Sequence, residues 1–444
     1  MPEVKRNRPA EMLALFRRLA TKLRAWALPS YFVILAAFLS LCYFVFGTYG
    51  LWPYRIESDG KYYYQYLVSG YYDRDFDFTN NYQAPRYEWM HLAIDHYNFL
   101  EQRGPVTGRP TNLFTIGPAI LWLPFFLLGQ LVAVSLNAVG AHIDINPWGL
   151  FFQYTVMYSA VVYTLLTLYL LFHLLRSHFA DRIAVYATWV LLFATNLFYY
   201  TIFEPSMSHV YDLCTYVVFL FLYLIGLRSP RLNIYFGLAL AGALHVLVRT
   251  QNMATIVLFS IALVVSRLLS HQGLPSARIV ATYGVTLLLG LLPIPLLNEY
   301  LYGHPFVIPQ GTDFLHWSDP RILEVLFSGR NGLFSHHPAL LLGLIGFVLF
   351  LYWIIKTRDR TQAIFFCAMF AAFMFQLYIN SSVADWWGGN SFGQRRLISS
   401  FPLFAFGLAF LIQRLHASHP RLNAWAIVVS TVTGLYLTYI HVFP

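Results

Sequence analysis

The stretch PALLLGLIGFVLFLYWII (338–355) carries no charged side chain, and the basic turn KTRDR (356–360) follows it directly. An α-helix needs about 20 predominantly apolar residues to cross the hydrocarbon core of a bilayer. Because lipid offers the backbone no hydrogen-bond partner, an apolar segment of this length predicts a membrane-spanning helix. Lysine and arginine accumulate in short cytoplasmic turns, so KTRDR predicts a cytoplasmic end.

The same alternation of apolar segments and short basic turns recurs along all 444 residues, of which 58% are hydrophobic and only 11% are charged. Soluble domains carry about 25% charged residues, so this composition excludes an ordinary soluble protein. The sequence predicts one all-α polytopic membrane domain over residues 1–444. The expected crossings are 30–53, 148–175, 183–201, 207–227, 233–249, 251–269, 279–300, 338–355, 361–380, 397–415 and 423–443.

A further apolar segment, 113–140, decides the topology. If it crossed once, the later basic turns would all face outward, against the charge rule. Gly117, Pro118 and Pro124 are also expected to interrupt a regular helix here. We therefore expect 113–140 to re-enter the membrane or lie along its interface. Residues 54–147 then form one large external loop with interfacial helices.

The net charge of +9 follows from this orientation and does not indicate nucleic acid. Many basic residues precede the first crossing, and residues 11–28 resemble a basic amphipathic helix on the cytoplasmic surface. We expect 1–29 to be a cytoplasmic segment. Most acidic residues fall on the opposite side, so the chemistry is expected on the external face.

Asp59 opens the longest polar stretch of the chain, in SDGKYYYQYL (58–67). A carboxylate beside a membrane-embedded cavity is a candidate functional group, because a charge near lipid is costly. Asp59 can accept a proton from a hydroxyl, or it can simply cap the helix that begins there. The tyrosines that follow, Tyr63 among them, favour a helix at the outer interface.

Two short segments later in the chain supply polar groups at the same predicted level. FEPSMSH (203–209) contains Glu204 and His209, which either bind substrate or belong to a capped, solvated loop. LVRTQN (247–252) places Arg249 at an external turn, against the charge rule. Arg249 is expected to bind a phosphate, or to pair with a carboxylate such as Glu204.

The segment DWWGGNSFGQRR (385–396) joins acidic, aromatic, glycine and basic residues at an outer boundary. Asp385 and Trp386 are candidates for substrate binding, and Arg395 and Arg396 for binding phosphate. The alternative is that the segment only anchors lipid headgroups. Histidines such as His336 and His337 do not form a metal-ligand pattern, since adjacent residues point apart on a helix. No metal site is predicted, and no cofactor is required, although a divalent metal is possible.

These features together resemble the GT-C superfamily of membrane glycosyltransferases, related to dolichyl-phosphate-mannose mannosyltransferases. In that family an acidic residue follows the first span, then come interfacial helices and a proline-bearing piece that does not cross. Asp59, the tyrosine helix and 113–140 match these parts. Many members with protein or lipid-A acceptors have adjacent Asp–Glu, whereas here Gly60 follows Asp59.

The resemblance implies an enzyme that moves a hexosyl or pentosyl unit from a polyprenyl-phosphate lipid to a glycan, lipid or protein acceptor, with inversion. Asp59 would be the base, and Arg249, Arg395 and Arg396 would bind the donor phosphate. The expected location is the bacterial cytoplasmic membrane, with the N-terminus inside. The alternative is a lipid or glycolipid transporter that uses the same arginines without catalysis.

Overall fold

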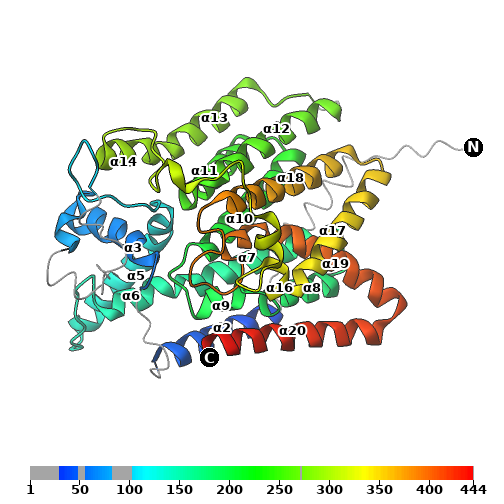
Figure 1. Ribbon diagram of the computed structural model, residues 1–444, viewed down its shortest axis with the longest axis horizontal. Coiled ribbons are helices and arrows are strands. Elements are labelled where there is room, and N and C mark those ends of the chain that lie inside the picture. Colours follow the sequence, from blue (N-terminus) through cyan, green and yellow to red (C-terminus); the bar gives the residue numbers. More distant parts are fainter. Residues whose placement is uncertain (1–29, 49–55, 83–102, 271–272, 444) are drawn as a thin grey trace, which may run out of the picture.

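The computed structural model describes residues 30–48, 56–82, 103–270 and 273–443. The described residues form helices joined by loops, with no strand beyond two isolated bridges. Most of the long helices run side by side along one direction, while α3 (Gly60–Val68), α5 (Gly117–Ala138), α6 (Leu150–Met157) and α14 (Pro293–Tyr302) gather toward one end (Figure 1). The predicted cytoplasmic segment 1–29 and part of the loop 54–147 lie outside the described residues.

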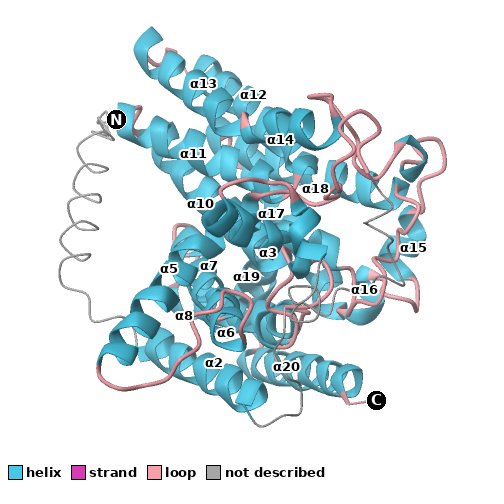
Figure 2. Ribbon diagram, turned by 90° about the vertical axis from the view of Figure 1, so that its left-hand side faces the viewer, coloured by secondary structure: helices cyan, strands magenta, loops and turns pink. Residues whose placement is uncertain are grey.

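The remaining helices of the bundle follow the apolar segments of the sequence. They are α2 (Ser30–Thr48), α7 (Ser159–Leu175), α8 (Asp181–Phe193), α9 (Leu197–Ile202), α10 (His209–Arg228), α11 (Leu232–Val248), α12 (Met253–Leu269), α13 (Ala277–Leu291), α17 (Pro338–Lys356), α18 (Arg360–Ser382), α19 (Phe401–Ser418) and α20 (Pro420–Val442). Two short helices, α15 (Ile322–Phe327) and α16 (Leu333–His336), precede α17 in the chain. Seen from the end that carries α3, α2 and α20 lie along one edge, and α12 and α13 lie far from them (Figure 2).

Glycines allow the closest approach between two of these helices. A Cβ on Gly407 of α19 would lie 1.7 Å from the carbonyl oxygen of Gly343 on α17, and a Cβ on Gly346 would lie 2.2 Å from the carbonyl oxygen of Gly407. Small residues at such contacts are a common feature of packing between membrane helices. The pair α17–α19 thereby fixes the start of α19, next to which two candidate arginines lie.

Nine helical segments among the described residues are long and apolar enough to cross a membrane. Eight of them coincide with predicted crossings, and two further predictions correspond to shorter apolar helices, Tyr31–Phe46 and Leu232–Val248. The predicted crossing 183–201 is divided into α8 and α9 by a break at Ala194–Asn196. The chain is therefore a multi-pass, all-helical membrane protein, and the count of eleven crossings stays a prediction.

The expected interruption of 113–140 by prolines is wrong. Pro118 lies in the first turn of α5, where its missing N–H costs nothing, and the helix continues through Pro124 to Ala138. This 22-residue helix is the ninth candidate span. Its start contacts the C-terminal end of α11, since a Cβ on Gly117 would lie 2.3 Å from the Leu247 carbonyl group.

The tyrosine helix also differs from expectation. All nine residues of α3 are buried, so its tyrosines pack inside the protein and do not face the interface. Tyr62 stacks on Phe114 with ring centroids 5.1 Å apart, and Tyr64 donates a hydrogen bond to the Pro147 carbonyl oxygen. Only Tyr71 and Tyr72, beyond the end of α3, are exposed. The helix is thus a fixed support for Asp59, which precedes it.

Candidate functional site

Asp59 occupies the N-cap position of α3, but its side chain makes no capping hydrogen bond. It faces Arg395 instead, with the Asp59 Oδ2 and Arg395 Nη2 atoms 3.7 Å apart. The Asp59 side chain remains 25% exposed, so another group can still reach the carboxylate. The simple capping alternative is therefore not what the structure shows.

Gly60 allows the start of α3, next to Asp59, to pack closely against the loop 203–208. A Cβ at Gly60 would lie 2.6 Å from the Cβ of Ser206, and Ser206 donates a hydrogen bond to the Glu57 carbonyl oxygen. A glutamate at position 60 would not fit against Ser206. The glycine that departs from the Asp–Glu pattern is thus required by a close contact between two parts of the site.

Glu204 belongs to the same loop, 203–208, as Ser206. Burial, together with the negative charges of Asp59 and Glu57, raises the pKa of the Glu204 carboxyl to about 7, although the positive charge of Arg395 lowers it. The sequence left open a pairing of Arg249 with Glu204, and the structure does not show that pairing. It borders a cavity of about 410 Å³, hereafter the outer cavity.

Arg249 lies in the break between α11 and α12, where its backbone is extended. Its Nη1 atom is 3.3 Å from Nδ1 of His209, the first residue of α10. A guanidinium can only donate, so Nδ1 of His209 must accept and the proton of the neutral ring lies on Nε2. The buried Nε2 has no hydrogen-bond partner. It is an unused donor surrounded by the positive charges of Arg249, Arg395 and Arg396.

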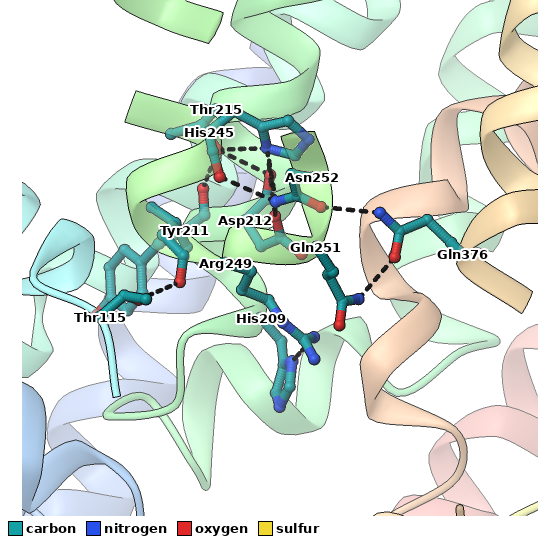
Figure 3. Close-up of polar contacts among 11 residues, drawn as sticks. Thr115, His209, Tyr211, Asp212, Thr215, His245, Arg249, Gln251, Asn252 and Gln376 are labelled. Carbon is teal, nitrogen blue, oxygen red and sulfur yellow. Dashed lines mark hydrogen bonds and ion pairs between the residues drawn. The ribbon is translucent and has the colours of Figure 1, made fainter. Parts of the chain in front are cut away.

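A buried polar network lies behind Arg249 (Figure 3). Asp212 Oδ1 is 3.2 Å from Nδ1 of His245 and accepts a 2.6 Å hydrogen bond from Asn252, while Asn252 Oδ1 accepts from Gln376. Asp212 and His245 are each 1% exposed. These contacts join α10, α11 and α18 to the turn that carries Arg249. The other oxygen of Asp212 has no hydrogen-bond partner, and its charge attracts Arg249.

Arg396 has a different environment from Arg395. Its Nη2 is 2.5 Å from Asp385 Oδ2, and its Nη1 donates to the Asp385 carbonyl oxygen. Trp386 packs against Trp387 with ring centroids 5.7 Å apart, and its carbonyl oxygen accepts from Gln394. Gly388 and Gly389 have φ angles of +78° and +71°, and a Cβ on either residue would lie 3.8–3.9 Å from the Arg395 side chain.

Tyr63 lies between the acidic and basic groups. Its ring is buried against Phe114 and Trp122, and its hydroxyl is influenced by the charges of Asp59, Arg249 and Arg395. Burial raises the pKa of the Tyr63 hydroxyl above its ordinary value, so the group remains protonated and can act as a donor.

Helix starts converge on this site. Asp59 precedes α3, His209 begins α10, and Arg395 and Arg396 begin the 3-10 helix η5 (Arg395–Ser400) that leads into α19. The start of a helix carries a partial positive charge from its free N–H groups. With three arginines and the donor on His209, the region strongly favours an anion such as phosphate.

The described residues do not offer a metal site. No group of three histidine, cysteine, aspartate or glutamate side chains lies close enough among them to hold an ion. Asp59 faces a guanidinium, which competes with a cation for the carboxylate. The described residues therefore contain no preformed site for a divalent metal.

Comparison with solved structures identifies similar folds. The oligosaccharyltransferase AglB from Archaeoglobus fulgidus, in complex with an inhibitory peptide and a dolichol-phosphate, aligns with 93% of this chain at a TM-score of 0.54 and 13% identity. The fold is similar to that of an archaeal oligosaccharyltransferase. The apo form of the A. fulgidus enzyme aligns with a TM-score of 0.54, and its complex with Zn and sulfate with 0.51, both at 14% identity.

This similarity concerns the fold alone, because the sequence identity is so low. The chain covers 52–55% of the length of these oligosaccharyltransferase chains. No protein-family model matches the chain. No curated protein matches it in sequence either.

Sequence reasoning identified Asp59, Arg249, Arg395 and His209, and the structure brings these four into one region. It did not identify His245, Asn252 and Gln376, whose spacing in the sequence gives no pattern. One signal was available, because Asp212 and His245 are ionisable residues inside apolar segments. Such residues usually have a partner and a function.

Proposed function

We propose that this chain is a membrane glycosyltransferase of the GT-C type, which transfers a sugar from a polyprenyl-phosphate donor to an acceptor hydroxyl. The observation that carries the proposal is the 3.7 Å approach of Asp59 to Arg395, beside a second arginine and a histidine N–H without a partner. A base and a phosphate site next to each other are what such a reaction requires.

In the proposed step the acceptor oxygen attacks the anomeric carbon of the donor sugar. The new C–O bond forms as the bond between the anomeric carbon and the phosphate oxygen breaks, with inversion at the carbon. Asp59 takes the proton of the acceptor hydroxyl. The bonding electrons leave with the polyprenyl phosphate, whose added negative charge is stabilised by Arg249, Arg395 and the Nε2–H of His209. Preorganised donors of this kind supply much of the rate enhancement of enzymes.

The similar archaeal structure supports the donor class, because it is a complex with a dolichol-phosphate. The same complex contains an inhibitory peptide, so a protein acceptor is one option for this chain. The apolar, lipid-facing helices suit a donor whose hydrocarbon tail lies in the membrane. We further propose a location in the bacterial cytoplasmic membrane, with the site on its external face.

The test is Asp59→Asn in a strain that lacks the native protein, with Asp313→Asn, in an exposed 3-10 turn, as the matched control. Asp59→Asn should reach normal levels in the membrane and yet form no glycosylated product, while the lipid-linked sugar accumulates. Mass spectrometry of surface glycans and lipid-linked intermediates measures both. Normal product formation by Asp59→Asn would contradict the enzyme assignment and favour the transporter, which needs no base.

The topology has its own test. With α5 not crossing, a reporter fused near Asn146 should be external and one fused near Ala180 cytoplasmic, because the basic turns then share the cytoplasmic side. Fusions made after Arg231 and after Thr357 serve as controls for the later turns. An external reporter at Ala180 would show that α5 crosses and that the predicted orientation is inverted.

A further inference from the structure

The outer cavity, of about 410 Å³, is not used by the proposed chemical step, and its volume is typical of pockets that bind small molecules. Its walls come from segments far apart in the sequence. Tyr199 belongs to α9 and Glu204 to the loop after it. Arg330 and Asn331 belong to the turn before α16, and Asn390 and Ser391 to the glycine-rich segment. Tertiary folding alone assembles this cavity.

The position of the cavity relative to the charged groups is informative. Glu204 forms part of its wall and is influenced by the charges of Arg395, Asp59 and Glu57, while Arg249 is not among them. Tyr63, by contrast, is influenced by Asp59, Arg395 and Arg249 together. Geometry gives the same connection, because a Cβ on Gly389 in the cavity wall would lie 3.9 Å from Arg395 Nη2, and that atom is 3.7 Å from Asp59 Oδ2. The cavity therefore borders the Asp59–Arg395 pair.

The walls of the cavity combine three kinds of group. Tyr199 offers an aromatic ring, held edge-on to His441 at a centroid distance of 5.1 Å. Glu204, Asn390 and Ser391 offer hydrogen-bond donors and acceptors. Arg330 offers an exposed guanidinium stacked 4.4 Å above the ring of Trp387.

One wall residue is held in an uncommon conformation. Asn331 has a φ of +105°, outside the range that most side chains adopt, and its amide donates to the carbonyl oxygens of Trp387 and Gly389. A backbone conformation of this kind persists only where surrounding contacts enforce it. These hydrogen bonds tie the Arg330 turn to the glycine-rich segment, so the two walls of the cavity form one unit.

We infer that the outer cavity binds the acceptor, and that this acceptor is a carbohydrate whose hydroxyl is presented to Asp59. A sugar ring has apolar C–H faces for the ring of Tyr199 and hydroxyl groups for the carboxylate, amide and hydroxyl side chains around it. Arg330 adds a position for an anionic substituent. A peptide has fewer hydroxyl groups to match these polar side chains. The inference rests on the proposed function and specifies its acceptor.

The experiment replaces a side chain at the rim of the cavity with a larger one that fills it. Asn390 is exposed and lines the cavity, so Asn390→Trp should fold normally and occupy the cavity. Ser318→Trp places the same side chain on an exposed loop elsewhere and is the control. In nanodiscs, saturation-transfer NMR with N-acetylglucosamine and glucuronic acid as probes should show binding to the wild type. Asn390→Trp should weaken it on the order of tenfold, equivalent to about 1.4 kcal/mol. Ser318→Trp should not change it.

The same variants are compared in cells by mass spectrometry. Asn390→Trp should lose the glycosylated product and accumulate the donor lipid, while the purified variant still binds polyprenyl phosphate as the wild type does. The inference about the cavity is overturned if Asn390→Trp forms the product at the wild-type level. It is also overturned if this variant loses phosphate binding while its sugar binding is unchanged. The inference is also overturned if the Asn390→Trp variant transfers sugar to a peptide as well as the wild type does. If Asp59→Asn and Asn390→Trp both leave all glycans unchanged, the proposed function itself fails.

Discussion

Arginines at the two ends of the bundle have different surroundings. At the end with the basic turns, Arg176 pairs with Asp181 in its own turn at 3.1 Å, and Arg267 donates to the carbonyl oxygens of Gly226 and Leu227. Those carbonyls belong to the C-terminal end of α10, where a positive charge is favourable. Arg414 and Lys356 lie over aromatic rings of their own helices. Each of these four basic groups has a local partner.

At the opposite end, Arg395 and Arg396 lie where η5 begins and leads into α19, a position at which the helix dipole disfavours a cation. Arg395 has a 3.7 Å contact with Asp59, and its Nε has no hydrogen-bond partner. Arg249 depends on a neutral histidine and a buried network. Our proposal assigns the first group of arginines to orienting the protein in the membrane and the second group to binding an anion.

The largest expected effect comes from removing a guanidinium at the site. Arg395→Gln and Arg249→Gln should each lower the turnover rate by about 10²–10³, the usual loss when one donor to a developing negative charge is removed. Arg231→Gln, in an exposed basic turn, is the control and should change turnover less than about twofold. Equal losses at Arg231 and Arg395 in a sugar-transfer assay would remove the distinction between the two ends.

A second expected effect concerns the network behind Arg249. Asp212→Asn removes the buried negative charge that balances the arginines, and breaking a buried ion pair costs about 3–5 kcal/mol. The melting temperature should fall, and polyprenyl phosphate should restore it more than it raises that of the wild type, because the ligand supplies the missing negative charge. Thr215→Val, which removes a neutral neighbour of His245, is the control. An identical ligand response in Asp212→Asn and the wild type would show that Asp212 does not act on the anion site.

The smallest expected effect is the pH dependence of stability at Glu204. The pKa of Glu204 is about 7 in the folded protein, above the ordinary value of 4.5, so the folded state holds its proton more tightly than the unfolded state. Its contribution to stability is therefore present below about pH 4.5 and is lost as the pH rises through about 7. Glu204→Gln should flatten the fall in melting temperature over this interval, whereas Glu299→Gln should not.

Much of the fold could be predicted from local sequence. Apolar length identified nearly all the bundle helices, because crossing lipid imposes the same requirement on each segment separately. The predictions that failed did so for specific reasons. Pro118 is tolerated in the first turn of α5, and the chain accommodates Pro124 within the helix. The tyrosines of α3 found partners inside the protein, such as Phe114 and Pro147, which no local pattern reveals.

The candidate site was predicted in part for a similar reason. Asp59, Arg249 and Arg395 stood out individually, because a charged residue is rare and costly near lipid. Their pairing could not be predicted, and neither could the contribution of Asn252 or Gln376. Neutral side chains become recognisable as functional only when their hydrogen-bond partners are known.

The sequence by itself determined that this is a multi-pass helical membrane protein and which charged residues require an explanation. Both conclusions depend on transfer of individual segments and side chains from water to lipid, a property of local composition. Only the tertiary structure decided that Asp59 faces Arg395, that His209 leaves one N–H unused, and that Glu204 borders a cavity. These relations depend on contacts of a few ångströms between distant segments, such as Gly60 against Ser206, which the packing of the bundle creates.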